Sequence, residues 1–419
     1  MKSRISLGMC LVLMLVAAFV TFQITYSALT NKYESTVYSF NKYTDLTTNF
    51  DAIDEAAEDS WRQLYSTLSE ADAYARNYYY HDIDNQALND NILTIYALSL
   101  EDRYATYYTA KEYVDVIESN VGNAHGVGVR VIPDKVYGGI YVYEVMEGSP
   151  AYEYGIRKGD IITSVDGVSV ASLGFEQACD TIISVPLDKA VSLEILTYSS
   201  SYRENVTKEI EKKPYDVQTV AVDMLTDDVA HIKIFEFNYN TGKEFASKMD
   251  AAIAGGAKRF IFDVRHNPGG IVDGVAETLD YLLPEGNIIT TKSRYGEEES
   301  LMSDEKCLEA PMVVLVDSST ASGGELFAAA LRDYEMATLI GTTTFGKGSM
   351  QTEHPLSDGS CIVFTTHMYF PPCGVSYDGL GVEPHKVVEL SDEQKANFFR
   401  LSIDQDSQLM AALDEVINK

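Results

Sequence analysis

The chain has 419 residues, of which 46% are hydrophobic, so it is long enough to bury the cores of two or three domains. Its 63 acidic residues outnumber 32 basic ones and give a net charge of -31. A surface this acidic lacks the positive charge that nucleic-acid backbones require. Disordered, fibrous and nucleic-acid-binding proteins are therefore not expected.

An apolar segment opens the chain. Lys2 and Arg4 precede an uncharged stretch, Ile5 to Ile24, that is long enough to span a bilayer as one helix. Positive charge before the segment and acidic residues after it predict a cytoplasmic N-terminus and an extracytoplasmic remainder. We expect residues 1–29 to be a single-pass membrane anchor, with a cleaved signal sequence and a secreted protein as the alternative.

The next two regions differ in glycine content and in predicted secondary structure. Residues 30–118 contain few glycines and carry helical patterning, for example from Asp51 to Trp61, so we expect a helical N-terminal region. Residues 119–200 contain short strand-like runs separated by glycines, which predict a small, mostly β module. The polar stretch from Tyr198 to Pro214 is interpreted as an exposed strand pair or linker.

Residues 201–390 alternate apolar strands with amphipathic helices, which predicts a layered α/β domain. The expected strands are Ala230–Phe235, Arg259–Val264, Met312–Val316 and Ala337–Ile340. The expected helices are Gly242–Ala254, Val272–Leu283 and Glu325–Arg332. Residues 391–419 are expected to form a C-terminal helix that begins at a cap. The fold class is therefore multi-domain α+β.

Four cysteines follow the apolar segment, and none forms a C-x-x-C pair of the kind that binds zinc or exchanges disulfides. They are Cys179, Cys307, Cys361 and Cys373. An oxidising compartment permits a disulfide, such as one between Cys361 and Cys373, and buried thiols are the alternative. No metal or cofactor is expected.

Three segments place small or polar residues directly after predicted strands, where open α/β sheets build their sites. The first runs from Asp263 to Gly270 as D-V-R-H-N-P-G-G. Pro268 fixes the backbone there, and Gly269 and Gly270 allow backbone N–H groups to face a ligand. An ordinary turn is the alternative.

In the second segment, Ser322 lies at the start of a predicted helix. The helix dipole and the N–H of Gly323 would stabilise the oxyanion formed when this serine attacks a carbonyl group. The alternative is simple capping, because Ser322 and Glu325 have the spacing of a capping box.

In the third segment, Lys347 lies between two glycines. Burial beside Ser322 would lower the pKa of the lysine and make it a base for the serine hydroxyl, and Gln351 could orient the neutral amine. A solvated loop lysine is the alternative.

The order of these motifs resembles the C-terminal processing peptidases. The segments D-V-R-H-N-P-G-G, S-T-A-S-G-G-E-L and T-F-G-K-G-S-M-Q follow one another as they do in that family. The resemblance implies a crotonase-like (ClpP-like) core in which Ser322 is the nucleophile, Lys347 its base and Gln351 an assisting residue. It also implies an oxyanion hole made by Gly323 with Gly269 or Gly270. Asp333 matches an acidic family position and is interpreted as structural support.

The glycine-rich module resembles a PDZ domain through G-V-G-V, which ends at Val129, and a second motif that begins at Gly148. In a PDZ domain, backbone amides hold a terminal carboxylate and the peptide adds as a strand. The resemblance assigns peptide binding to Val127, Gly128 and Val129. The segment from Leu100 also resembles the family, with Arg103 where proline is usual.

Two other reactions fit the sequence less well. A phosphate-binding loop needs Ser or Thr after Lys347, where Gly348 stands. A Ser-His-Asp triad using His266 or His354 would normally place glycine at Thr320. We therefore expect an extracytoplasmic serine endopeptidase that recognises protein C-termini. A catalytically silent PDZ scaffold at the membrane is the alternative, and substrate, cleavage rule, PDZ regulation and oligomeric state stay open.

Overall fold

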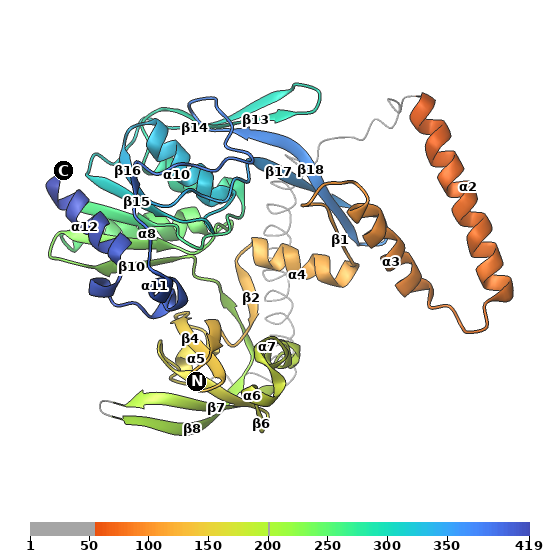
Figure 1. Ribbon diagram of the computed structural model, residues 1–419, viewed down its shortest axis with the longest axis horizontal. Coiled ribbons are helices and arrows are strands. Elements are labelled where there is room, and N and C mark those ends of the chain that lie inside the picture. The colour runs from red at the N-terminus through yellow and green to blue at the C-terminus, as the bar shows by residue number, and fades with distance from the viewer. Residues whose placement is uncertain (1–54, 200–201) are drawn as a thin grey trace, which may run out of the picture. The chain divides into compact units, whose positions relative to one another are not determined.

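The structure is a computed structural model that describes residues 55–199 and 202–419 (Figure 1). The predicted anchor at residues 1–29 lies outside these described residues. Among the described helices, none is both long and apolar enough to cross a membrane. The described residues divide into two compact units, one ending at Ile92 and the other running from Leu93 to Lys419.

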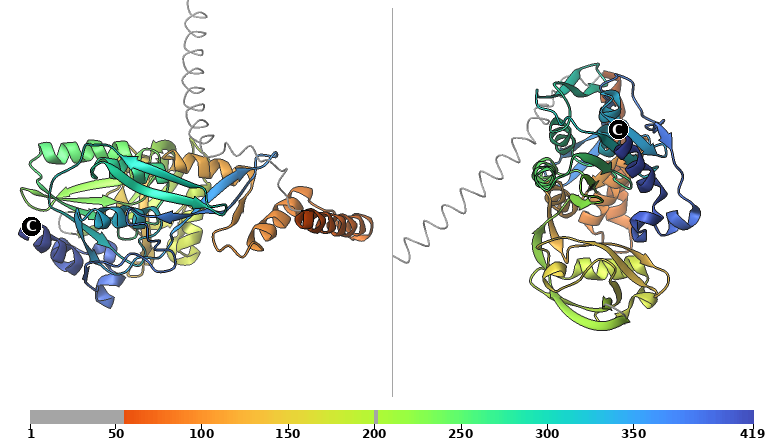
Figure 2. Two further views of the ribbon diagram at one scale, coloured as in Figure 1. Left: turned by 90° about the horizontal axis from the view of Figure 1, so that it is seen from above. Right: turned by 90° about the vertical axis from the view of Figure 1, so that its left-hand side faces the viewer.

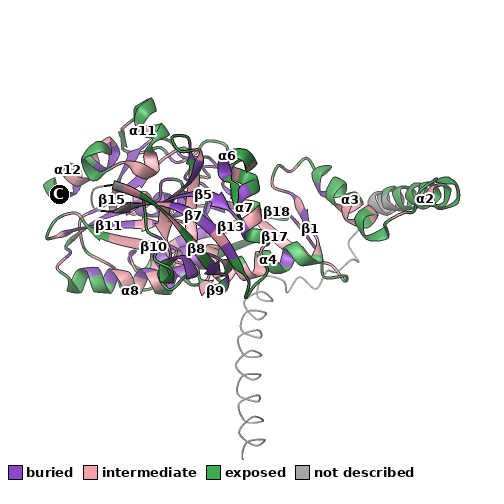
Figure 3. Cartoon of the chain, turned by 90° about the horizontal axis from the view of Figure 1, so that it is seen from below, coloured by how far each residue is buried: buried purple, intermediate pink, exposed green. Residues whose placement is uncertain are grey.

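The first unit is helical where it is described, as the sequence predicts. It contains α2 (Glu55–Tyr78) and the start of α3 (Asn85–Leu98). Arg76 joins the two helices, because it pairs with Asp72 at 2.6 Å and donates to Asn85 Oδ1 at 2.8 Å. Most side chains of α2 are exposed (Figure 3).

In the second unit, the glycine-punctuated region forms a β module. Its sheet has the order β3-β4-β5-β7-β8, with β6 paired to β5. The strands are β3 (Val129–Asp134), β4 (Gly139–Val145), β5 (Ile161–Val165), β6 (Val168–Ser169), β7 (Ala190–Ser199) and β8 (Tyr202–Glu211). The helices are α5 (Pro150–Glu153), α6 (Val170–Leu173) and α7 (Phe175–Ser184). Strand β8 lies beyond residue 200, where the predicted module ends, because it pairs along the whole of β7.

Two short strands connect the β module to the rest of the unit. They are β2 (Asn123–Gly126) and β9 (Lys213–Asp216), and they pair antiparallel. The chain therefore enters and leaves the β module side by side.

The α/β core is built on a six-stranded sheet with the order β10-β11-β12-β15-β16-β19. All of these strands are parallel to their neighbours except β10. They are β10 (Val220–Met224), β11 (Val229–Ile234), β12 (Arg259–Asp263), β15 (Met312–Val316), β16 (Ala337–Gly341) and β19 (Lys386–Val387). Every residue of β15 is buried, which explains its unbroken apolar sequence.

Helices cover both faces of this sheet (Figure 2). One face packs against α8 (Thr241–Ala254), α9 (Val272–Asp280) and α10 (Gly323–Asp333) in the largest apolar cluster. The other face packs against α12 (Ser407–Asn418) through Leu409, Ala412 and Val416. The layered α/β domain is therefore present, with each predicted element displaced by only a few residues.

A second, five-stranded sheet borders the core. Its strands are β1 (Thr106–Tyr108), β13 (Gly286–Ser293), β14 (Glu298–Ser303), β17 (Ser349–Pro355) and β18 (Cys361–Phe370). Strand β1 falls inside the region expected to be helical, because Tyr107 is buried where β1 pairs with β18. The remaining helices are α4 (Ala110–Asn120), α11 (Asp392–Ala396) and the 3-10 turns Phe398–Arg400 and Ile403–Gln405.

The four cysteines outside the opening segment are free thiols. Of the two residues suggested as a disulfide, Cys361 is buried and Cys373 is exposed. The expected buried thiol is therefore present at Cys361 alone, whereas Cys307 is exposed like Cys373.

Candidate active site

The three predicted motifs meet at one edge of the parallel sheet. Strands β12, β15 and β16 are parallel neighbours, and each motif begins where its strand ends. The carboxyl edge of an open α/β sheet is the usual place for a binding site. The three motifs lie between residues 263 and 351, so the topology brings together residues that are up to 88 positions apart in the sequence.

Ser322 occupies the turn between β15 and α10. Its backbone has φ 51° and ψ -116°, and the residue is only 7% exposed. A positive φ is uncommon for a residue other than glycine, whereas an ordinary N-cap residue is extended. Ser322 is thus held in a strained turn of the kind that presents a nucleophile, beyond what helix capping needs.

Backbone amides surround Ser322. A Cβ added to Gly269 would lie 2.7 Å from both Ser322 Cβ and Gly323 N, so these segments touch. A Cβ on Gly323 would lie 3.5 Å from Gly270 N. The amide of Gly269 is already used, because it donates to Asn267 Oδ1 at 2.7 Å. Gly270 is therefore the better of the two predicted partners for Gly323.

Glu325 connects the serine turn to the lysine loop. Its side chain is fully buried and accepts four hydrogen bonds. The donors are the amides of Ser322 (2.9 Å), Gly346 (2.6 Å) and Lys347 (2.7 Å) and the hydroxyl of Thr344 (2.5 Å). Since Ser322 and Lys347 share one carboxylate oxygen, their backbones are held next to each other. The sequence signal of Glu325 is only that of a capping residue, so its contacts with the lysine loop were not predicted.

Lys347 is partly buried, and its Nζ lies 4.5 Å from the centre of the Tyr104 ring. Burial lowers the pKa of Lys347, and the nearby Arg103 guanidinium lowers it further. The carboxylates of Asp102 and Glu325 oppose this change. The amine therefore has the environment expected of a lysine base.

Gln351 lies on β17 beside this loop. Its Nε2 donates to Thr365 Oγ1 at 3.0 Å and to Ser349 Oγ at 3.3 Å. The amide of Thr365 in turn donates to Asp102 at 2.7 Å. Within residues 55–199 and 202–419, no hydrogen bond joins the Lys347 amine to Ser322 or Gln351. The structure brings the backbones of Ser322 and Lys347 together, but the lysine amine is not hydrogen-bonded to the serine hydroxyl.

A buried ion network supports the glycine motif. Arg265 pairs with Asp263 at 2.7 Å and with Asp406, the N-cap of α12, at 2.8 Å. His231 contacts the same Asp263 at 3.1 Å. The pKa of Asp263 is held well below its usual range: burial alone would raise it, but Arg265 and His231 outweigh that effect. These residues fix the start of the loop that carries Gly269 and Gly270.

The histidines considered for a triad have other partners. His266 contacts Asp317 at 3.3 Å and packs against the Phe398 ring with centroids 4.4 Å apart. His354 stacks on Phe364 at 4.5 Å. In the described chain, neither histidine forms a hydrogen bond to Ser322. Asp333 pairs with Arg332 and accepts from the Cys373 amide at 3.0 Å, so its contacts are structural.

The predicted peptide-binding loop lies in the β module, between β2 and β3. Gly128 has φ 85°, and a Cβ there would lie 2.1 Å from Ser149 Cβ. Its carbonyl accepts from Met146 N at 3.1 Å and from Ser149 Oγ at 3.2 Å. In the part of the chain that the structure describes, the amides of Val127 and Gly128 donate to no protein acceptor. Two adjacent free amides suit a carboxylate.

No group of three or more His, Cys, Asp or Glu residues arranged to hold a metal ion occurs among the described residues. The residues gathered at the sheet edge are instead a serine, a partly buried lysine and free amides. This set is suited to acyl transfer.

Comparisons with known proteins agree with this chemistry. Residues 228–388 match the model of peptidase family S41, and residues 141–197 match a PDZ domain. A carboxyl-terminal-processing protease of Synechocystis is 31% identical over 323 residues, which are 75% of this chain and 74% of that protein. The carboxy-terminal processing protease CtpA of Bacillus subtilis is 29% identical over 352 residues, or 84% and 74% of the two chains.

Solved structures share the fold. A crystal structure described as an S41 protease of Bacteroides fragilis has a TM-score of 0.54 and 16% identity, and it covers 80% of this chain and 90% of that one. The predicted fold class is confirmed: N-terminal helices, a PDZ module and an S41 α/β core. The chain belongs to peptidase family S41 and is a C-terminal processing serine protease with a PDZ domain.

Proposed function

We propose that this protease cleaves peptide bonds with Ser322 as the nucleophile, Lys347 as its base and Gln351 as the residue that orients the amine. The observation that carries the proposal is the Glu325 carboxylate, which binds the amides of both Ser322 and Lys347. The bond to the Ser322 amide belongs to the capping box, which is present, but the bonds to Thr344, Gly346 and Lys347 go beyond what a helix cap needs. These bonds are what a nucleophile and base on separate loops require.

The reaction follows from these positions. The neutral Lys347 amine removes the hydroxyl proton while Ser322 Oγ bonds to the substrate carbonyl carbon. The N–H groups of Gly323 and Gly270 hold the oxyanion, and the lysine then passes its proton to the leaving amine as the C–N bond breaks. Water activated by the same lysine hydrolyses the acyl-enzyme. In the described arrangement the Lys347 amine must move from the Tyr104 ring toward Ser322 before the first step.

We also propose that the free amides of Val127 and Gly128 bind the C-terminal carboxylate of the substrate. Replacing Gly128 by Val is expected to raise KM about tenfold or more for a substrate with a free C-terminus, because the side chain would clash with Ser149 and strain the loop. Steady-state cleavage of a fluorogenic peptide measures this. Gly167→Val is the matched control, since Gly167 also has a positive φ (79°) but no atom near its Cβ position. Equal effects of both substitutions would contradict the loop assignment.

The pKa of Lys347 predicts the pH dependence. Cleavage requires the neutral amine, so kcat/KM should rise with pH through this pKa, at a lower pH than an ordinary lysine would give. Arg103→Met should move the midpoint to higher pH, because it removes a positive charge that lowers the pKa. Asp102→Asn should move it to lower pH, because it removes a negative charge that raises the pKa. A midpoint that stays fixed in both variants would exclude Lys347 as the titrating base.

The proposed location is extracytoplasmic, with residues 1–29 as the membrane anchor. The charge order of Lys2 and Arg4 before the apolar segment supports this orientation. In intact cells, a membrane-impermeant maleimide should label the exposed thiols of Cys307 and Cys373 in the full chain. Labelling only after lysis would place the protease domain in the cytoplasm.

A further inference from the structure

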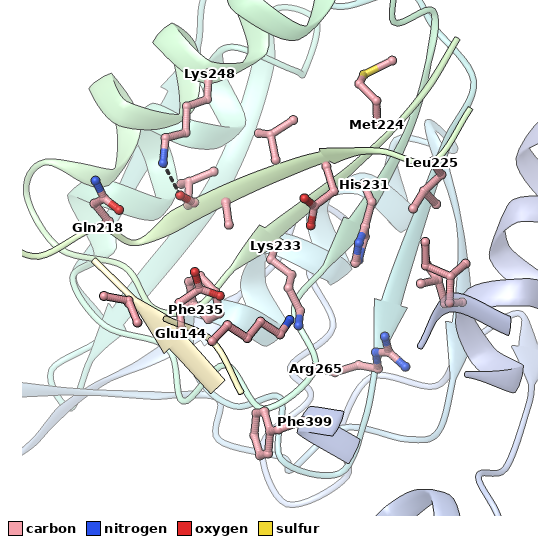
Figure 4. Close-up of a pocket in the computed structure, with 18 of the residues that line it drawn as sticks. Glu144, Gln218, Met224, Leu225, His231, Lys233, Phe235, Lys248, Arg265 and Phe399 are labelled. Atoms are coloured by element: carbon pink, nitrogen blue, oxygen red, sulfur yellow. Dashed lines mark hydrogen bonds between the residues drawn. The ribbon is translucent and has the colours of Figure 1, made fainter. Parts of the chain in front are cut away.

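A pocket of about 800 Å³ lies between the PDZ domain and the α/β core (Figure 4). The end of strand β4 and the two residues after it form one wall, from Glu144 to Glu147, and β10 and β11 form the other. The turns at Phe398–Phe399 and Leu401–Ile403 close one side. The described residues that line it include neither Ser322, nor Lys347, nor the Val127–Val129 loop. It is thus separate from both sites described above.

Strand β10 presents a free edge in this pocket. It is the first strand of the six-stranded sheet and, among the residues that the structure describes, pairs only with β11. Two bonds fix which residues face β11: Leu225 N donates to Val229 O, and Phe235 N donates to Thr219 O. In an antiparallel ladder the intervening residues direct their N–H and C=O groups outward. Val222 and Met224 therefore offer unpaired backbone groups, whereas the Val220 carbonyl is taken by Lys248.

The pocket follows this edge. His231 and Lys233 line it from the face of the sheet that carries α12, and Ala251 and Ala252 of α8 line it from the opposite face. Because residues on both faces of the sheet line this cavity, the cavity must extend past the open edge of the sheet. Such an edge accepts an extended peptide as an additional strand.

Lys233 adds a charge requirement. Its side chain points into the pocket (Figure 4), and burial lowers its pKa. In residues 55–199 and 202–419, its amine forms no hydrogen bond or ion pair. The neighbouring Arg265 differs, because Asp263, Asp406 and Gln408 already bind it. Among the described residues, the Lys233 amine is therefore left without a direct ion-pair partner.

Other charged groups form no ion pair with this amine. The buried Asp263 carboxylate is close enough to raise the pKa of Lys233, but Asp263 pairs with Arg265 and His231 instead. Lys158 of the PDZ domain is close enough to lower its pKa further. Glu144 faces both lysines, but burial raises the pKa of Glu144 and weakens it as a counter-ion. The carboxylates of Glu147 and Asp223 belong to exposed residues. An incoming carboxylate can pair with Lys158 and Lys233 together.

We propose that this pocket is a second peptide-binding site, which takes an extended acidic segment of the substrate as a strand on β10 and pairs one of its carboxylates with Lys233. The identification of that segment with substrate rests on the proposed function. The site would hold the polypeptide at a place distinct from both its C-terminus and the scissile bond. Unfolded substrates with acidic segments would then be preferred.

A binding assay tests the site without requiring proteolysis. The full chain carrying Ser322→Ala is titrated against a fluorescein-labelled peptide of twelve alternating acidic and apolar residues, and fluorescence anisotropy is recorded. An amidated C-terminus removes the carboxylate that the PDZ loop would bind. Lys233→Gln should weaken binding about tenfold or more, as loss of a charge-assisted hydrogen bond does. The same peptide with Asn and Gln in place of its acidic residues should bind equally weakly.

A second pair of variants tests strand addition. Val222→Pro removes an outward N–H but no bond to β11, so it should weaken binding about tenfold while the protein stays folded by circular dichroism. Val222→Ala keeps the N–H and should bind like the parent. The proposal is overturned if the acidic peptide does not bind the parent, or if Lys233→Gln binds it unchanged. If the wild type cleaves no substrate but the variants still show this binding pattern, the result counts only against the proposed function.

Discussion

Replacing either Ser322 or Lys347 by Ala is expected to reduce kcat for an unfolded protein substrate by about 10⁴-fold or more, since residues that act as one catalytic unit cost nearly the full rate when either is removed. The double variant should be no worse than the single ones for the same reason. Cleavage of a protein with an apolar C-terminus, followed by gel and mass spectrometry, measures the loss. The full chain is used in detergent, without metal or nucleotide.

Two further substitutions separate base chemistry from positive charge. Lys347→Arg keeps the charge but cannot become a neutral base at ordinary pH, so it should be as inactive as Lys347→Ala. Lys386→Ala is the control, because Lys386 is an exposed lysine of the edge strand β19 and pairs with Glu415. Activity that survives Lys347→Arg would exclude a lysine base. An inactive wild type that still binds peptide C-termini would favour the scaffold alternative.

The fold was predictable where periodicity and burial agree. The apolar strands of the core and the helices between them follow directly from patterning, because the strands are buried on two faces and α8 and α9 on one. Helix α10 is buried along nearly its whole length. Strand β1 was missed because three residues are too few to show alternation, and its position depends on pairing with Cys361 to Val363 more than 250 residues later. Non-local pairing of this kind leaves no local signal.

The candidate site was predictable only in part, for a similar reason. The positions of Ser322, Gly323 and Lys347 follow from small residues placed after strands, and the family resemblance orders them. The roles of Tyr104 and Asp102 could not be read from their own segment, since both act across a distance of more than 240 residues on Lys347 and Thr365. The choice between Gly269 and Gly270 likewise required the hydrogen bond from Gly269 to Asn267.

The sequence marks Glu325 only as a capping residue, but in the structure it connects the serine turn to the lysine loop. Its substitution should therefore affect both the stability of the fold and the rate of cleavage. Glu325→Ala would leave four buried donors without an acceptor, so the free energy of unfolding should fall by about 3 to 5 kcal/mol, as when a buried charged partner is removed. Chemical denaturation monitored by far-UV circular dichroism measures this change.

Glu325→Gln separates the two effects because it keeps the shape and one acceptor oxygen. In this variant an NH2 group replaces one of the two carboxylate oxygens and cannot accept a hydrogen bond. One pair of donors, either the Ser322 and Lys347 amides or the Thr344 hydroxyl and Gly346 amide, must therefore shift. A displacement of about 1 Å between nucleophile and base should lower kcat about 10²-fold while KM changes little. Glu389→Gln is the matched control, because Glu389 is exposed and pairs with Lys395 at the surface, so the stability and the rate of this variant should stay near wild type. If Glu325→Gln kept full kcat despite reduced stability, Glu325 would support the fold without positioning the serine against the lysine.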